Sequence, residues 1–303
     1  MTGRIARFLR RQTPEPPEVT EAVAQLARLA ETQADLRQAA ALQSALLRAM
    51  YATLVAVLPI AMTAEDTTAR FAGGVPLLRN VALPCEAHQL RDTFLRLCEA
   101  ATTISPGTAS GAPDHAVYTT LAEAVKHERL DLWTLGNTWL TGAVQTLPAQ
   151  LEAQGYAADL VLTLLRLTLL PCLEHVAIQL APLRAARPWG RGYCPTCGAW
   201  PLLAEQRGLE QWRYLRCGLC ASAWKVERLF CPFCTTRDFH VLGYLQVEGE
   251  EPRQRVVTCS ACQSYLKLCS TLTPLSTPQL LVEEIALVHL DLIAMDNGYG
   301  PPL

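Results

Sequence analysis

Apolar residues recur at helical spacing through the first half of the chain. From residue 17 to about 62 they fall three or four positions apart, with Gln, Glu and Arg between them, which predicts one long or two stacked amphipathic helices. The pattern returns over three further segments, at about 86–103, 114–146 and 156–183. Residues 64–84, which contain Gly and Pro breakers, are expected to form a loop. The sequence therefore begins with a predicted α-helical bundle.

The pattern changes after Arg187-Pro188-Trp189-Gly190, which ends the last helical segment. Apolar and polar residues then tend to alternate, and residues 239–247 and 253–258 are predicted to be two strands joined by an acidic turn. Thr277-Pro278 is typical of a helix start, so we expect a final helix over about 279–295.

Four Cys-x-x-Cys pairs lie within 69 residues of this second part. Two thiolates three positions apart can both point into one tight turn, and two such turns facing each other supply a tetrahedral site of four sulfurs. The gaps between successive pairs are 19, 10 and 24 residues, so the first two pairs and the last two pairs each enclose enough chain for a β-hairpin. We therefore predict two metal sites, formed by Cys194, Cys197, Cys217 and Cys220 and by Cys231, Cys234, Cys259 and Cys262. A cross-braced pairing, first pair with third and second with fourth, is the competing arrangement.

Hairpins that carry paired cysteines at one end are the plan of a zinc ribbon or a rubredoxin. The predicted fold is α+β and multidomain, with an N-terminal α-helical bundle followed by two rubredoxin-like or zinc-ribbon modules and a C-terminal helix. The predicted segments are a disordered arm at 1–17, the α-helical bundle at 18–186, a first four-cysteine ribbon at 187–229, a second four-cysteine ribbon at 230–275, and a C-terminal helix and tail at 276–303.

Composition narrows the class of protein. The chain has 303 residues, 50% of them hydrophobic, and a formal charge of −2, so it can build a core and has no overall attraction for nucleic acid or an anionic membrane. The most apolar stretches, 46–62 and 157–180, are broken by charged residues and Pro, which favours buried helices over membrane spans. No export signal is expected at Arg10-Arg11, and strict Cys-x-x-Cys pairing indicates metal in a reducing cytoplasm in place of a disulfide framework.

The paired cysteines admit more than one chemistry. Structural zinc and redox-active iron share the four-sulfur donor set and its geometry, so the residues do not separate them. Either metal would replace the core that a small ribbon lacks. A thioredoxin-like dithiol needs a βαβ unit, which the pattern does not show. Cys85, Cys98 and Cys172 are expected to be packing residues, and Cys269 a spare thiol near the second site.

No arrangement of residues indicates catalysis. The six histidines are scattered, and His175 is expected to be a packed residue of its helix. No Ser-His-Asp order, phosphate-binding Gly loop or pair of carboxylates stands out. We therefore expect a protein that is not an enzyme.

Nucleic-acid binding is the main alternative function, because cations and aromatic residues gather near the cysteine pairs. These residues are Arg213, Arg216, Lys225, Arg228, Arg253, Arg255 and Lys267, with Trp212, Tyr214 and Trp224 between them. Residues 191–269 carry ten Lys and Arg against seven Asp and Glu, a net charge of +3 that is weak for that role. Arg216, Arg228 and Arg255 could instead neutralise a four-sulfur metal site.

The motifs together resemble a known family, the formate dehydrogenase accessory proteins FdhE. The matching residues are Cys194-Pro195-Thr196-Cys197-Gly198, Arg213-Tyr214-Leu215-Arg216-Cys217, Cys220, Trp224, Cys231, Cys234, Arg255, Cys259-Ser260-Ala261-Cys262, Tyr265-Leu266-Lys267, Leu290-Asp291 and Gly298-Tyr299. The helical part resembles the family only in type and length.

The resemblance implies a cytoplasmic, chaperone-like maturation factor for respiratory molybdenum-dependent formate dehydrogenases. It favours iron over zinc in the two four-cysteine sites, and it implies the immature catalytic subunit as the partner that these modules bind. It implies no membrane span, and it makes nucleic acid an unexpected partner. The oligomeric state stays open, and a homodimer is one option.

Overall fold

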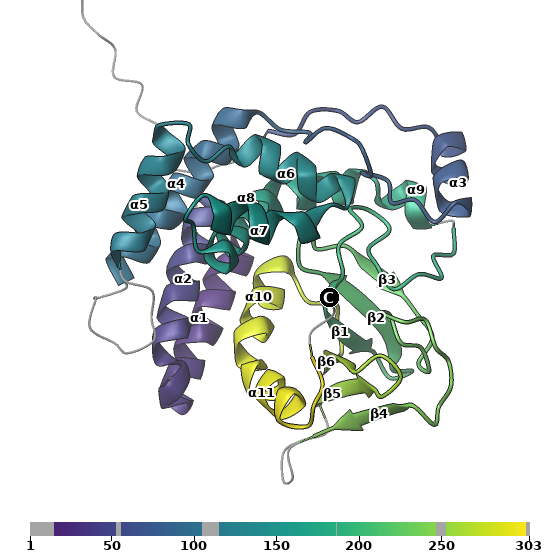
Figure 1. Cartoon of the computed structure of the whole chain (residues 1–303). Coiled ribbons are helices and arrows are strands. Elements are labelled where there is room, and N and C mark those ends of the chain that lie inside the picture. The colour runs from purple at the N-terminus through teal and green to yellow at the C-terminus, as the bar shows by residue number, and fades with distance from the viewer. Residues whose placement is uncertain (1–14, 53–55, 105–114, 186, 247–252, 301–303) are drawn as a thin grey trace, which may run out of the picture.

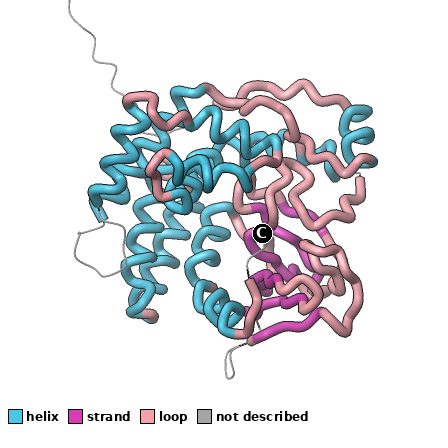
Figure 2. The backbone as a smooth tube through the Cα atoms, in the orientation of Figure 1, coloured by secondary structure: helices cyan, strands magenta, loops and turns pink. Residues whose placement is uncertain are grey.

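The fold is seen in a computed structural model that describes residues 15–52, 56–104, 115–185, 187–246 and 253–300. Most of the predicted arm at 1–17 lies outside these residues. Helices form the first part of the chain, and a sheet and two further helices form the second (Figures 1 and 2). The helices of the first part are α1 (Pro17–Thr32), α2 (Arg37–Tyr51), α3 (Ala64–Ala72), α4 (Ala87–Ile104), α5 (His115–Lys126), α6 (Leu132–Thr141), α7 (Leu147–Ala153), α8 (Ala158–Gln179) and α9 (Ala181–Ala185).

Helix α8 is the central helix of the bundle. It contacts α2, α4, α6 and α7, and Leu residues on all sides of it are buried. Among the described helices it alone is long and apolar enough to cross a membrane, but 67% of its most apolar window is buried by the rest of the protein. A helix that is hydrophobic all round and covered on most sides belongs to a protein core. This agrees with the buried helix predicted at 156–183.

Helix α3 corrects one expectation, because it lies at the start of the segment predicted to be a loop. Thr63 begins the helix with a capping box, in which its side chain accepts a hydrogen bond from the Asp66 backbone N–H and the Asp66 carboxylate accepts one from the Thr63 N–H. Such a box satisfies two backbone donors that a helix start leaves free. The Thr-x-x-Asp spacing was the local signal for this helix.

The two cysteine-bearing modules form one sheet with strand order β3-β2-β1-β6-β5-β4. Within each module neighbouring strands are antiparallel, and the modules join through β1 and β6, which run parallel from Ala204 beside Leu268 to Arg207 beside Thr271. The predicted fold class is confirmed, with this seam as an addition. The strands are β1 (Pro201–Arg207), β2 (Trp212–Cys217), β3 (Ala223–Lys225), β4 (Leu242–Leu245), β5 (Gln254–Cys259) and β6 (Ser264–Thr271).

The final helix is two helices, α10 (Thr277–Ala286) and α11 (Val288–Asp296), separated at Leu287. Helix α10 contacts α1 and α2, whereas α11 contacts β5 and β6, so the pair lies between the bundle and the sheet (Figure 1). Asp291 of α11 accepts hydrogen bonds from Lys267 Nζ at 2.7 Å and from Tyr265 Oη at 2.9 Å. These contacts hold α11 on the sheet, and they unite residues that the family resemblance had singled out separately.

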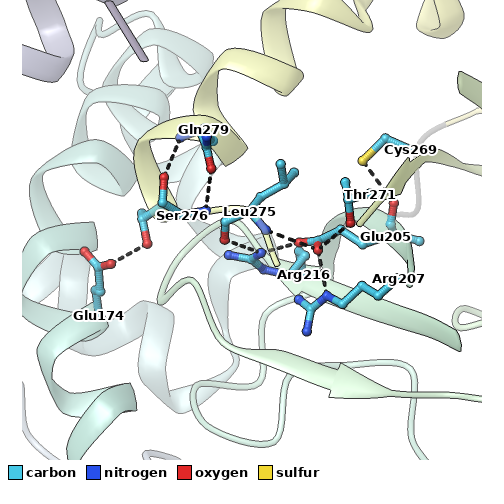
Figure 3. A network of polar contacts seen from close by, with 11 residues as sticks. Glu174, Glu205, Arg207, Arg216, Cys269, Thr271, Leu275, Ser276 and Gln279 are labelled. Atoms are coloured by element: carbon cyan, nitrogen blue, oxygen red, sulfur yellow. Dashed lines mark hydrogen bonds and ion pairs between the residues drawn. The ribbon is translucent and has the colours of Figure 1, made fainter. Parts of the chain in front are cut away.

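A buried carboxylate reinforces the β1–β6 seam (Figure 3). Glu205 of β1 is 0% exposed and is ion-paired with Arg216 of β2 and, at 2.7 Å, with Arg207. It also accepts hydrogen bonds from Thr271 Oγ1 at 3.5 Å and from the Leu275 backbone N–H at 3.3 Å, while Arg216 donates to the Leu275 carbonyl at 2.8 Å. One acidic side chain thus connects both modules to the segment that begins α10.

The helical bundle and the first module share one continuous hydrophobic core, which includes side chains of both. The backbone N–H groups of Leu77 and Leu78 donate to the carbonyls of Pro195 and Thr196, at 2.9 and 2.8 Å, within the first cysteine turn. Leu203, Cys269 and several residues of α10 and α11 form a second, smaller core. The domain boundaries given above stay predictions, and the contacts across residue 187 are extensive.

Candidate metal centres

Each Cys-x-x-Cys pair lies in the same kind of tight turn. The residue after the second cysteine has left-handed backbone geometry in all four turns, with φ of 83° at Gly198, 55° at Ala221, 63° at Thr235 and 56° at Gln263. In three of the turns the N–H of that residue donates to the carbonyl of the first cysteine, at 2.9, 3.1 and 3.0 Å. Such a turn points both thiols to its inner side. The sequence therefore encodes four equivalent loops, each of which presents two sulfurs.

The first cluster contains Cys194, Cys197, Cys217 and Cys220, all buried. Its sulfurs approach across the hairpin, at 3.5 Å for Cys194–Cys220 and 3.4 Å for Cys197–Cys217. The backbone N–H groups of Thr196 and Leu219 lie 3.4 Å from the Sγ atoms of Cys194 and Cys217 as donors. Hydrogen bonds of this kind stabilise negative charge on sulfur.

The second cluster contains Cys231, Cys234, Cys259 and Cys262, and it is more open. The Sγ atoms lie 3.7 Å apart for Cys231–Cys262 and 3.6 Å apart for Cys234–Cys259. Cys231 and Cys259 are buried, whereas Cys234 is exposed and Cys262 is half-buried. Solvent therefore reaches one side of the second cluster and does not reach the first.

Both clusters fit a tetrahedral metal ion. A metal–sulfur bond of about 2.3 Å implies sulfurs about 3.8 Å apart in a tetrahedral site, and in each cluster all four sulfurs lie within 4.8 Å of one another. Burial raises the pKa of Cys197 and Cys217 well above the ordinary thiol value, because a buried thiolate is unfavourable without a cation beside it. The structure brings the sulfurs together in the sequential pairing, and metal ligation by these eight residues stays a prediction.

Arg213, one of the cations considered for nucleic-acid binding, lies behind the second cluster. Arg213 is 2% exposed, and its Nη1 donates to the carbonyls of Arg228 and Phe230 at 3.2 and 2.9 Å. Its Nε and Nη2 have no hydrogen-bond partner in the part of the chain that the structure describes, and burial lowers its pKa to about 10. Cys231 is close enough to oppose that shift. A buried cation here suits a four-thiolate metal site, whose net charge is negative.

The residues proposed earlier for that neutralising role have other partners. Arg216 pairs with Glu205, Arg228 donates to the Gln211 carbonyl at 3.4 and 3.3 Å, and Arg255 binds the Gln206 side chain. The spacing of Arg213 on β2 gave no sign of its position, because the carbonyl groups that it contacts lie 15 and 17 residues further along the chain.

A row of three aromatic side chains connects the two cysteine clusters. Tyr193 and Trp200 beside the first cysteine turn have ring centroids 6.0 Å apart, and Trp200 lies 5.6 Å from Phe233, which stands between Cys231 and Cys234. Gly192 is in close contact with the Cys231–Cys234 turn. A Cβ added to Gly192 would be 1.7 Å from the Pro232 carbonyl oxygen. The two cysteine turns are therefore in contact through backbone as well as side chains.

We expect Gly192→Ala to destabilise the protein by about 1–3 kcal/mol, the usual cost of overpacking a tight contact. The atoms in the way are backbone atoms of Pro232, so no side-chain movement relieves the clash. Urea denaturation measures the loss. Gly190→Ala is a matched control, since an added Cβ there meets nothing within 4 Å. Equal stability of both variants would contradict the close contact.

The remaining cysteines lie outside both clusters. Cys85, Cys98 and Cys172 are buried in the main core, and burial raises the pKa of Cys98 to about 12. Cys269 is buried in the second core, where its Sγ lies 3.7 Å from the Ala204 carbonyl oxygen. These are positions of packing residues.

The cations considered for nucleic-acid binding do not form one surface. Arg213, Arg216 and Lys267 are buried, at 2%, 4% and 7% exposed, and the last two are ion-paired. Trp224 is also buried, and its indole N–H donates to the Arg191 carbonyl at 3.1 Å. Phosphate binding needs accessible cations, so this grouping does not provide it.

We expect the protein purified without oxygen to hold two metal ions per chain, and a chelator to remove the second site's ion first. The reason is the exposure of Cys234, against the complete burial of the first cluster. Metal analysis during incubation with a chelator would show two phases. Cys234→Ser should abolish the fast phase alone. One ion per chain, or loss of both at the same rate, would contradict the prediction.

Comparison with known proteins gives a family context for the first cluster. Residues 193–228, the segment of the first cluster, match the family model described as FdhE, central domain. The protein FdhE homolog of Aquifex aeolicus (strain VF5) is 34% identical over 115 residues, and that of Stutzerimonas stutzeri (strain A1501) is 39% identical over 111 residues. The resemblance to FdhE is confirmed.

The similarity to FdhE has different extents in sequence and in fold. The two alignments cover 37% and 35% of this chain and only 40% and 35% of those FdhE homologs, so the chain matches well under half of their length. The crystal structure of the FdhE protein from Pseudomonas aeruginosa matches over 96% of both chains, with a TM-score of 0.63 and 23% sequence identity. At that identity the match shows a shared fold.

Proposed function

We propose that this protein is an accessory factor in the assembly of a respiratory molybdenum-dependent formate dehydrogenase. In this role it binds the immature catalytic subunit in the cytoplasm through its metal-stabilised four-cysteine modules. The observation that carries the proposal is the pair of four-cysteine clusters built into one sheet. The segment of the first cluster, residues 193–228, matches the FdhE central domain. We assign no catalytic residue, because the role is to hold another protein.

The metals would act first as cross-links. Each would tie two loops of its module together, which supplies folding free energy that a small ribbon lacks. We propose iron at both sites on the family resemblance, and the four-sulfur donor set accepts zinc equally well. When bound, iron adds a one-electron redox couple that zinc does not have.

Nucleic-acid binding is not favoured as an alternative. The net charge of residues 191–269 is small, and three of the seven cations considered for that role are buried. One of the buried cations, Arg216, instead neutralises the buried carboxylate of Glu205.

The proposal predicts that the purified protein captures the catalytic subunit of a formate dehydrogenase before that subunit is exported. Capture should depend weakly on salt, as in an ordinary protein interface, and should be lost when both sites lose metal. A nucleic-acid binder would instead lose affinity steeply, by about 0.9 log unit per log unit of salt for each phosphate neutralised. Co-purification from cells that express the enzyme, over a salt series, measures both. Retained nucleic acid with no captured subunit would overturn the proposal.

A further inference from the structure

A cleft between the helical bundle and the first module is not used by either metal cluster. Its volume is about 740 Å³, and its wall is rich in aromatic side chains from α3, the segment after α9, β2, and β3 with the residues after it. The aromatic residues are Phe71, Trp189, Trp212, Tyr214, Trp224 and Phe230. Trp212 is 48% exposed, so part of this wall is open to a ligand.

One wall of the cleft is the free edge of the sheet, strand β3. The Val226 N–H donates to the Arg213 carbonyl and the Cys217 N–H to the Ser222 carbonyl, which fixes the hydrogen-bonded register with β2. Because hydrogen-bonding direction alternates along an antiparallel strand, the backbone groups of Ala223 and Lys225 point away from β2. Both residues line the cleft, and no described backbone group bonds to their outward side.

The cleft is positively charged. Among the described residues, Arg184, Arg187, Lys225 and Arg237 line it with one acid, Glu227, which is ion-paired with Arg237 at 2.7 Å. The other three cations contact only neutral groups among the described residues. Arg187 bonds to Thr68 and to backbone carbonyls, and Lys225 lies 3.2 Å from the centre of the Trp212 ring.

Arg184 lines the cleft and makes few hydrogen bonds to the described residues. Its Nη2 donates to the Ala177 carbonyl at 3.2 Å, while its Nε is buried and has no hydrogen-bond partner among the described residues. No described carboxylate pairs with its charge, so the guanidinium can attract an acidic group that enters the cleft.

We propose that this cleft binds an extended acidic segment of a partner protein, which adds as a further strand to the free edge of β3. The outward backbone groups of Ala223 and Lys225 would pair with the segment's main chain, and its acidic side chains would meet Arg184, Arg187 and Lys225. Apolar side chains at alternate positions would pack on the aromatic wall, as in other cases of strand addition. That the segment belongs to the formate dehydrogenase catalytic subunit rests on the proposed function, whereas the site itself does not.

A labelled octapeptide that alternates Glu with Val tests the site on the full-length, metal-loaded protein, with a Lys-Val octapeptide as the opposite-charge probe. We expect the acidic peptide to bind and the basic peptide not to bind. Binding of the acidic peptide should weaken at high salt. Lys225→Pro, which removes the outward N–H and the charge, should weaken binding about tenfold or more, and Lys225→Gln, which removes the charge alone, about threefold. Lys126→Gln, an exposed lysine on α5, should change nothing.

Hydrogen exchange of the wild-type protein gives a readout that does not depend on the variants folding. The amide protons of Ala223 and Lys225 should exchange several-fold more slowly when the acidic peptide is bound, because strand addition protects them. Absence of binding, equal binding of both peptides, or binding without this protection would overturn the proposed site.

Capture of the catalytic subunit separates the site from the proposed function. If wild-type protein captures the subunit and Lys225→Pro and Lys225→Gln capture it equally well, this cleft is not the subunit's site and the assembly role stands. If wild-type protein captures no subunit while the acidic peptide binds with the protection described, the site stands and the assembly role falls.

Discussion

Replacement of Cys194 and Cys197 by serine together is expected to unfold the first module and to loosen the part of the bundle that rests on it. A structural metal site of four cysteines contributes roughly 10–16 kcal/mol of apparent binding free energy, against a total stability of about 5–15 kcal/mol for a typical domain. The first cluster is fully buried in the core that it shares with the bundle. Its turn also accepts hydrogen bonds from Leu77 and Leu78, so the loss should extend to that segment.

Hydrogen exchange with mass spectrometry would locate the damage in the Cys194→Ser/Cys197→Ser variant. We expect loss of protection over β1–β3 and at Leu77 and Leu78, with α1 and α2 much less affected. Metal content should fall from two ions to one. Cys98→Ser is a suitable control, since Cys98 is equally buried and lies outside both clusters. Unchanged protection at Leu77 and Leu78 would mean that the first module and the bundle are independent.

The second large effect is expected from Glu205→Ala, which should destabilise the protein by about 3–5 kcal/mol. Glu205 is completely buried, and its removal leaves Arg216, only 4% exposed, without its carboxylate. The same change removes the acceptor for the Leu275 N–H, and with it a link between the sheet and the start of α10. Most of the expected loss of stability comes from the buried charge of Arg216, which would have no counter-charge, and less comes from the lost contacts of the carboxylate.

Further variants at Glu205, Arg207 and Arg216, measured by urea denaturation, test whether the unpaired charge causes the loss of stability. Glu205→Gln keeps the shape and part of the hydrogen bonding, so it should cost less than Glu205→Ala. Arg207→Gln should cost least, because Arg207 is 15% exposed and water can replace part of its contact. In the double variant Glu205→Ala/Arg216→Met much of the lost stability should return. A double variant less stable than Glu205→Ala would contradict an uncompensated-charge effect.

The cysteine turns and their sequential pairing could be predicted because both depend on short-range spacing. A separation of three positions between the cysteines of one turn, and a hairpin's length between the turns, leave little freedom. The helices were predictable for the same reason, since the apolar pattern of α8 and its neighbours is local. Helix α3 was missed because Gly73-Gly74 and Pro76 suggested a loop, whereas the capping box at Thr63 and Asp66 decided its start.

The features that could not be predicted all depend on contacts between distant segments. The sequence around Ala204 and Leu268 does not indicate that β1 and β6 lie side by side. The burial of Arg213 involves carbonyl groups 15 and 17 residues away, and Cys269 lies in the second core together with Leu203 of β1. The break at Leu287 arises where the chain leaves α1 and α2 and turns along β5 and β6. Periodicity describes one element at a time and cannot report these.

The parallel seam between β1 and β6 also has a consequence for the time course of folding. During synthesis β1 leaves the ribosome before β6, and until β6 arrives one edge of β1 has no partner. Pairing of strands that are distant in sequence is slow, because the entropy of closing the loop is lost before any contact between the strands stabilises the chain. Until the strands pair, the open edge can pair with other chains. Closure of this seam is therefore expected to limit the folding rate, and the interval before closure is when the nascent chain is most prone to aggregate.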